Sequence, residues 1–90
     1  MKRKIFIMGA STGIGRALAI NYASDNTILG LGARRVELLE ELKKECELQN
    51  CETFIYENDV NIPQECERSA QDFLNKAKGI DIIIANSGVG

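Results

Sequence analysis

The sequence predicts an α/β fold in which a parallel sheet carries helices on both faces. Short apolar runs alternate with amphipathic segments along the chain, which gives the order βαβαβαβ. Alternation at this spacing is typical of parallel strands joined by right-handed crossovers. The last run contains Ile82, Ile83 and Ile84 in succession, and continuous apolar runs of this kind are typical of interior strands of parallel sheets.

The first half of the chain supplies two strands and one helix. The first strand is predicted over residues 4–8, and the second over residues 27–32, where Gly30 and Gly32 keep one face of the strand small. Between them the spacing of apolar residues predicts a helix over about residues 13–23. The residues predicted to form its inner stripe are Ile14, Ala17, Leu18, Asn21 and Tyr22.

The second half supplies two helices and two further strands. A helix beginning at Val36 is predicted to end at Gln49-Asn50, with an inner stripe of Val36, Leu39, Leu42 and Cys46. The third strand covers residues 53–56. The third helix starts at Pro63 and is terminated by Gly79, and its inner residues are Cys66, Ala70, Phe73, Leu74 and Ala77. The last strand runs from Ile80 to Ala85.

Length and composition exclude several classes of function. Ninety residues make one domain or part of one. The chain has 11 basic and 13 acidic residues, a balance that argues against nucleic-acid binding. It contains no histidine, so Ser-His and Cys-His nucleophilic sites and His-ligated metals are excluded.

Cysteine usage and hydropathy bear on the cellular compartment. The cysteines are Cys46, Cys51 and Cys66, and no pair has Cys-x-x-Cys spacing, so we expect reduced thiols and no metal site. The basic start and the apolar run after it are interrupted too early for a signal peptide, and no run has the length of a membrane helix. We therefore expect a soluble cytoplasmic protein with no membrane partner.

A glycine-rich loop links the first strand to the first helix. Gly9, Gly13 and Gly15 fall within seven positions. Such glycines allow a tight turn, a close approach of the backbone to a pyrophosphate, and close packing of helix on strand. The helix N-terminus then offers free N–H groups to phosphates. A P-loop would need Gly-Lys-Ser/Thr at its end, but Arg16 follows Gly15. A plain strand-to-helix turn is the alternative.

The Gly-x-x-x-Gly-x-Gly spacing resembles the short-chain dehydrogenase/reductase family, although Met8 stands where that family usually has Thr. Asn58-Asp59-Val60 resembles the Asp-Val of the family, whose carboxylate meets the adenine amino group. Residues 85–88, Ala-Asn-Ser-Gly, resemble its Asn-Asn-Ala-Gly signature. The resemblance implies a Rossmann-type sheet of order 3-2-1-4. Residues 1–90 would then be the N-terminal part of a single NAD(P)-binding domain, incomplete relative to the family's full fold.

The resemblance also implies which residues bind a nicotinamide dinucleotide. They are Gly9, Ser11, Thr12, Gly13, Ile14, Gly15, Arg34, Arg35, Asp59, Val60, Asn86, Ser87 and Gly88.

The end of the second strand predicts which dinucleotide this is. NAD sites place an acid there for the ribose 2′-hydroxyl, whereas NADP sites supply Arg for the 2′-phosphate. Ala33 occupies the position and is followed by Arg34 and Arg35, so NADP is predicted over NAD, with Arg34 as the main contact. The alternative is that both arginines are merely solvated residues at a helix start.

Members of the family use a Ser and a Tyr-x-x-x-Lys pair for NAD(P)-dependent carbonyl reduction or alcohol oxidation. Neither tyrosine gives the motif, since Asn26 lies four residues after Tyr22 and Val60 four after Tyr56. We predict an oxidoreductase portion that is inactive alone. The alternative is a nucleotide-binding or interaction module without catalysis. The open apolar edge of the strand over residues 80–85 predicts a homo-oligomer, paired through this strand or by swapping elements.

Overall fold

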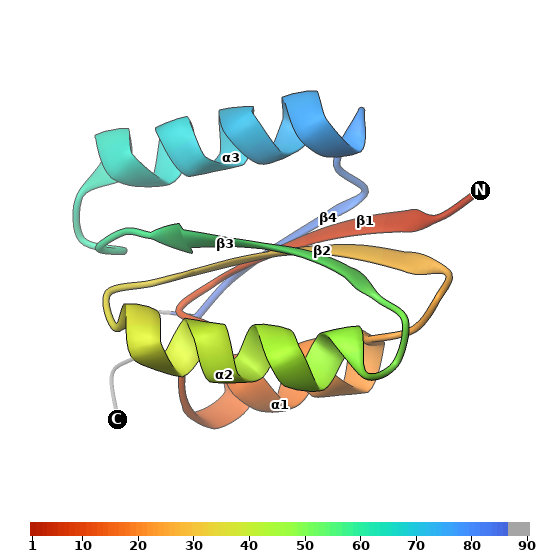
Figure 1. Cartoon of the computed structure of the whole chain (residues 1–90). Helices are drawn as coiled ribbons and strands as arrows, with labels where there is room; N and C mark the ends of the chain where they lie inside the picture. Colours follow the sequence, from red (N-terminus) through yellow and green to blue (C-terminus); the bar gives the residue numbers. More distant parts are fainter. Residues whose placement is uncertain (87–90) are drawn as a thin grey trace.

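The computed structural model describes residues 1–86 as a four-stranded parallel sheet with three helices (Figure 1). The strands are β1 (Arg3–Met8), β2 (Thr27–Ala33), β3 (Glu52–Glu57) and β4 (Ile82–Ala85). The helices are α1 (Gly13–Tyr22), α2 (Val36–Glu47) and α3 (Pro63–Ala77). The strand order β3-β2-β1-β4 confirms the predicted topology. Within the described residues no helix is long and apolar enough to cross a bilayer.

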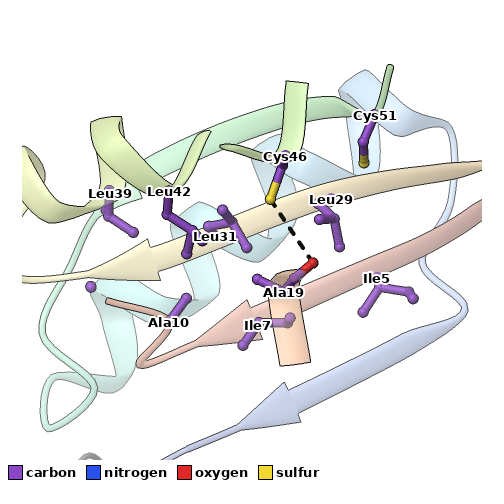
Figure 2. Packing of buried hydrophobic residues seen from close by; sticks show 11 residues of the cluster. Ile5, Ile7, Ala10, Ala19, Leu29, Leu31, Leu39, Leu42, Cys46 and Cys51 are labelled. Carbon is purple, nitrogen blue, oxygen red and sulfur yellow. Dashed lines mark hydrogen bonds between the residues drawn. The ribbon is translucent and has the colours of Figure 1, made fainter. Parts of the chain in front are cut away.

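One core lies between the sheet and the helices α1 and α2, which cover the same face (Figure 1). Leu39, Leu42 and Cys46 project from α2 toward side chains of β1 and β2 (Figure 2). All three are fully buried, as their predicted stripe requires. The Cys46 thiol donates a long hydrogen bond of 3.9 Å to the Ala19 carbonyl, which links α2 to α1 (Figure 2).

The second core is aromatic and lies between the opposite face of the sheet and α3. Phe73 of α3 packs on Phe6 with ring centroids 5.5 Å apart, and on Phe54 at 6.2 Å. A Cβ on Gly30 would lie 2.5 Å from the Phe6 ring, so the small face predicted for β2 is filled by aromatic rings.

The structure corrects two predicted inner faces. On α1, Ile14 is 71% exposed and Ala17 and Asn21 are exposed, whereas Gly15 and Ala19 are buried. The smallest residues face the sheet because α1 lies close to it, and the larger Ile14 turns outward. On α3, Leu74 is 38% exposed because Phe73 occupies the inward position beside it.

The last strand is shorter and more exposed than its sequence predicts. At Asp81 the carboxylate, not a main-chain carbonyl, accepts the Lys4 N–H at 2.9 Å, so regular pairing begins at Ile82. β4 is an edge strand of the described sheet, and Ile83 is 55% exposed, so the expected burial on both faces is wrong for these residues. The left-handed residue that ends α3 is Lys78, with φ 64°, one position before the predicted Gly79.

Candidate functional site

The loop after β1 is held against the ends of two neighbouring strands. The N–H groups of Gly9 and Ala10 both donate to the Gly32 carbonyl, at 2.8 and 3.0 Å. Gly9 has φ +76°, and a Cβ there would overlap the main-chain carbonyl oxygen of Asn86. The Asn86 side-chain amide in turn donates to the Gly9 carbonyl at 3.2 Å. Position 9 therefore has no room for a side chain.

The N-terminus of α1 is open in the manner that phosphate binding needs. Gly13 has φ +58°, and nothing lies within 4 Å of where its Cβ would be. Thr12 makes no side-chain capping hydrogen bond, and the first turn carries no acidic residue. Gly15 is buried, and a Cβ on it would overlap the Gly9 carbonyl oxygen. The loop thus presents uncapped N–H groups and the positive end of the helix dipole beside open space.

A pocket of about 200 Å³ opens at the carboxyl edge of the sheet, beside this loop. Seven of the predicted residues line it, namely Gly9, Ser11, Thr12, Arg34, Arg35, Asp59 and Val60. Three different strand ends supply them, because parallel strands place their carboxyl ends at one edge. These seven of the thirteen predicted residues therefore share one site.

Among residues 1–86, Gly13 and the other predicted residues do not line this pocket. Gly15 acts through packing against Gly9, and the Ile14 side chain is largely exposed. Asn86 contacts the loop through Gly9 and lines a different hollow, next to α3. The predicted contacts at Ser87 and Gly88 lie outside the described residues.

Two arginines give the pocket its positive charge. The Arg34 side chain is 73% exposed, and its Nη1 lies 3.9 Å from Asp59 Oδ2. Arg35 is similarly exposed and approaches Glu37 at 3.5 Å. Both contacts are long and solvated, so they contribute little to stability and leave the guanidinium groups accessible. No carboxylate belongs to the residue that ends β2, because this residue is Ala33.

The turn after β3 fixes the Asp59 carboxylate. Its Oδ1 accepts the Asn61 N–H at 2.9 Å, and the main-chain N–H of Asp59 donates to Glu65 Oε1 at 2.9 Å. The sequence prediction missed Asn58 and Asn61, which also line the pocket. Their position directly after an apolar strand is the pattern that could have identified them.

Tyr56, a residue of β3, has a pKa that does not suit a catalytic acid or base. The Tyr56 hydroxyl donates to Asp72 Oδ2 at 2.8 Å, on the face covered by α3. Burial and this hydrogen bond raise the pKa of Tyr56 far above its usual value, whereas the same bond lowers the pKa of Asp72. A tyrosine acting as acid or base needs its pKa shifted toward neutrality.

Comparison with known proteins agrees with this geometry. The sequence profile of the short chain dehydrogenase family matches residues 3–90. An uncharacterized oxidoreductase of Mycobacterium tuberculosis is 34% identical over an alignment of 91 positions, which covers 99% of this chain and 36% of that protein.

Solved structures share the fold as well as the sequence pattern. An alcohol dehydrogenase of the archaeon Thermococcus sibiricus, complexed with 5-hydroxy-NADP, superposes with a TM-score of 0.85 at 33% identity, covering 92% of this chain and 36% of that one. L-Sorbose reductase of Gluconobacter frateurii, complexed with NADPH and L-sorbose, superposes with a TM-score of 0.86 at 27% identity. The superposition covers 100% of this chain and 35% of that one. The chain spans about a third of the length of these relatives. Its profile match, sheet order and glycine loop together make it a member of the short-chain dehydrogenase/reductase family.

Proposed function

We propose that residues 1–90 are the N-terminal, cofactor-binding part of a cytoplasmic NADP-dependent oxidoreductase. The observation that carries the proposal is a single pocket, which joins the glycine loop to Arg34 and Arg35 and in which Ala33 replaces an acid. When bound, the dinucleotide would supply hydride for carbonyl reduction or accept it in alcohol oxidation.

The residues present fit such a cofactor. The uncapped start of α1 would take the pyrophosphate, since the space beside Gly13 is open and the dipole is not neutralised by a first-turn acid. Asp59 would accept a hydrogen bond from the adenine amino group, and Val60 would pack beside the base. Asn86, Ser87 and Gly88 are proposed contacts nearer the nicotinamide.

The choice of NADP rests on the adenosine side of the pocket. A guanidinium offers two parallel N–H donors that match phosphate oxygens. Arg34 is exposed enough to leave its long contact with Asp59 for a 2′-phosphate. The alcohol dehydrogenase that carries 5-hydroxy-NADP supports the same cofactor class by analogy.

Adenosine 2′,5′-bisphosphate tests this choice, because it carries only the groups that this chain would hold. We expect calorimetric titration of the 90-residue chain to give about tenfold tighter binding than 5′-AMP, the contribution of one charge-assisted contact to the 2′-phosphate. Arg34→Ala should abolish the difference. Lys44→Ala, which removes one exposed positive charge in the last turn of α2, is the control and should preserve it. Equal affinity for the two nucleotides would refute the NADP assignment.

We propose that the 90-residue chain has no oxidoreductase turnover of its own, because it lacks the Ser and Tyr-x-x-x-Lys expected of the family. A nucleotide-binding module without catalysis is the second candidate, and it predicts the same titration. Oxidation of NADPH by this chain with any carbonyl substrate would overturn the claim of inactivity. A coding sequence that continues past Gly90 with these residues would favour the enzyme over the module.

We also propose that the 90-residue chain self-associates through the edge of β4 that has no partner strand among residues 1–86. Ile83 is exposed beside a hollow of about 460 Å³, whose lining includes Met8, Pro63 and Ala70. An unpaired apolar edge favours pairing with a second chain. Light scattering should give a mass above that of the monomer, and Ile83→Lys should lower it, whereas Leu48→Lys at the exposed end of α2 should not. A monomer mass for the unmodified chain at micromolar concentration would refute the proposal.

A further inference from the structure

The first two turns of α3 hold Asn58 and Asp59, the two residues that follow β3. The Asp59 N–H donates to Glu65 Oε1 at 2.9 Å, and the Asn58 side-chain amide donates to Ser69 Oγ at 2.9 Å. Glu65 and Ser69 are four residues apart, so they lie on one face of the helix. We call these two hydrogen bonds the α3 anchor.

Burial of the Asn58 side chain costs the fold some stability. It is 2% exposed, and its Oδ1 is buried without a hydrogen-bond partner among residues 1–86. A Cβ on Gly32 would lie 2.8 Å from the Asn58 amide nitrogen, so the amide fits only because β2 has no side chain there. An unpaired buried amide atom destabilises a fold, so stability does not explain an asparagine at this position.

The anchor acts at the Asp59 end of the nucleotide pocket. Asn58 and Asp59 line this pocket, whereas Glu65 and Ser69 line an adjoining hollow of about 460 Å³ on the other side of Asn58 and Asp59. Asp59 is also the residue whose carboxylate lies next to Arg34. Displacing the main chain at residues 58–59 would therefore move the carboxylate relative to both the pocket and the guanidinium.

We infer that Glu65 and Ser69 are positioning residues for the nucleotide site, holding Asp59 where it meets the adenine side of a bound nucleotide. The inference rests on the proposed function and adds residues of α3 to it. Neither side chain contacts the nucleotide in this scheme, because both act through residues 58–59.

The first test uses Glu65 variants of the full chain with adenosine 2′,5′-bisphosphate as the probe. Glu65→Ala should weaken binding about tenfold, since it removes a hydrogen bond to a charged acceptor. Glu65→Gln keeps an acceptor oxygen and should stay within about threefold of the unmodified chain. Glu67→Ala, two residues along the same helix and exposed, should leave the affinity unchanged. Affinity that is unchanged in Glu65→Ala, or lost equally in Glu65→Gln, would overturn the inference.

Two further measurements separate positioning from mere stability. In an Asp59→Ala background, which has no acceptor for the adenine amino group, Glu65→Ala should cause no further loss of affinity, because its effect passes through the Asp59 carboxylate, and additive losses would contradict this. The double variant Asn58→Leu with Ser69→Ala replaces both partners by apolar groups, so its thermal midpoint should be unchanged or higher while binding weakens. A lower midpoint with unchanged binding would mean that this half of the anchor is only structural.

Failure of the proposed function can be told apart from failure of the anchor. If the unmodified chain does not bind the bisphosphate, the proposed function is wrong. Amide exchange at Asp59, measured by NMR without nucleotide, then tests the anchor alone. Faster exchange in Glu65→Ala than in Glu65→Gln would support the anchor, and equal rates would overturn it.

Discussion

Gly15→Ala should destabilise the chain, although the same change stabilises most helices. Gly15 lies in the first turn of α1, where alanine has the higher intrinsic helix propensity, by about 1 kcal/mol. The added Cβ would overlap the Gly9 carbonyl oxygen and lie 3.0 Å from Ala10 Cα. Both obstacles are main-chain atoms, so they cannot be relieved by rotating a side chain.

The expected magnitude follows from these opposing effects. Overpacking a tight site costs about 1–3 kcal/mol, and the rigid surroundings place this site at the upper end. Subtracting the propensity gain leaves a loss of about 2 kcal/mol in the free energy of unfolding. For a chain of this size such a loss lowers the thermal midpoint by roughly 8–16 °C.

Thermal unfolding followed by far-UV circular dichroism measures this shift. Gly13→Ala is the matched control, because its Cβ would enter open space and only the left-handed φ of +58° is penalised, by about 1–2 kcal/mol. The steric argument requires Gly15→Ala to lose at least as much stability as this control. A midpoint for Gly15→Ala equal to or above that of the unmodified chain would refute it.

Three other outcomes follow from the described contacts. Phe73→Ala should cost about 3–5 kcal/mol in chemical denaturation, because the ring is fully buried against other aromatic rings; a loss below about 1 kcal/mol would contradict the packing. The pKa of Asp72 is lowered first by the hydrogen bond from Tyr56, so this carboxylate stabilises the fold above its usual pKa range, and the stability is lost as the pH falls through the lowered value. Asp72→Asn should therefore show a smaller loss of stability on acidification, and an identical pH profile would refute the assignment. Burial raises the pKa of Cys46 to about 11, so iodoacetamide at pH 8 should label the half-buried Cys66 first in the folded chain; earlier labelling of Cys46, identified by mass spectrometry, would contradict its burial.

The element order and the parallel sheet could be predicted from the alternation of apolar runs and amphipathic segments, whereas the strand order 3-2-1-4 came from the resemblance to the family. The faces of individual helices were harder. On α1 the apolar side chain of Ile14 predicted that this residue faces inward. The helix lies so close to the sheet that the small residues Gly15 and Ala19 face it instead. The spacing of apolar residues shows which face of a helix is apolar, but it does not show how close the helix lies to the sheet.

The sequence also predicted some features of the candidate site and missed others. The glycine loop and Asp59 were predictable, because the position of each after a strand places them at one edge of the sheet. The contact between Arg34 and Asp59 was not, since it depends on how the ends of β2 and β3 lie side by side. Nor could the sequence indicate that Gly32 makes room for a buried Asn58 amide.

The contact between Gly9 and Asn86 has a consequence for the order of folding. These residues are 77 positions apart, yet the Asn86 main chain fills the space that a side chain at position 9 would take. β1 pairs with β2 on one side and with β4 on the other, so its second row of hydrogen bonds forms only once β4 is in place. Contacts of such long sequence separation form slowly. During synthesis the glycine loop, although encoded in the first fifteen residues, cannot reach its final shape until residue 86 has left the ribosome.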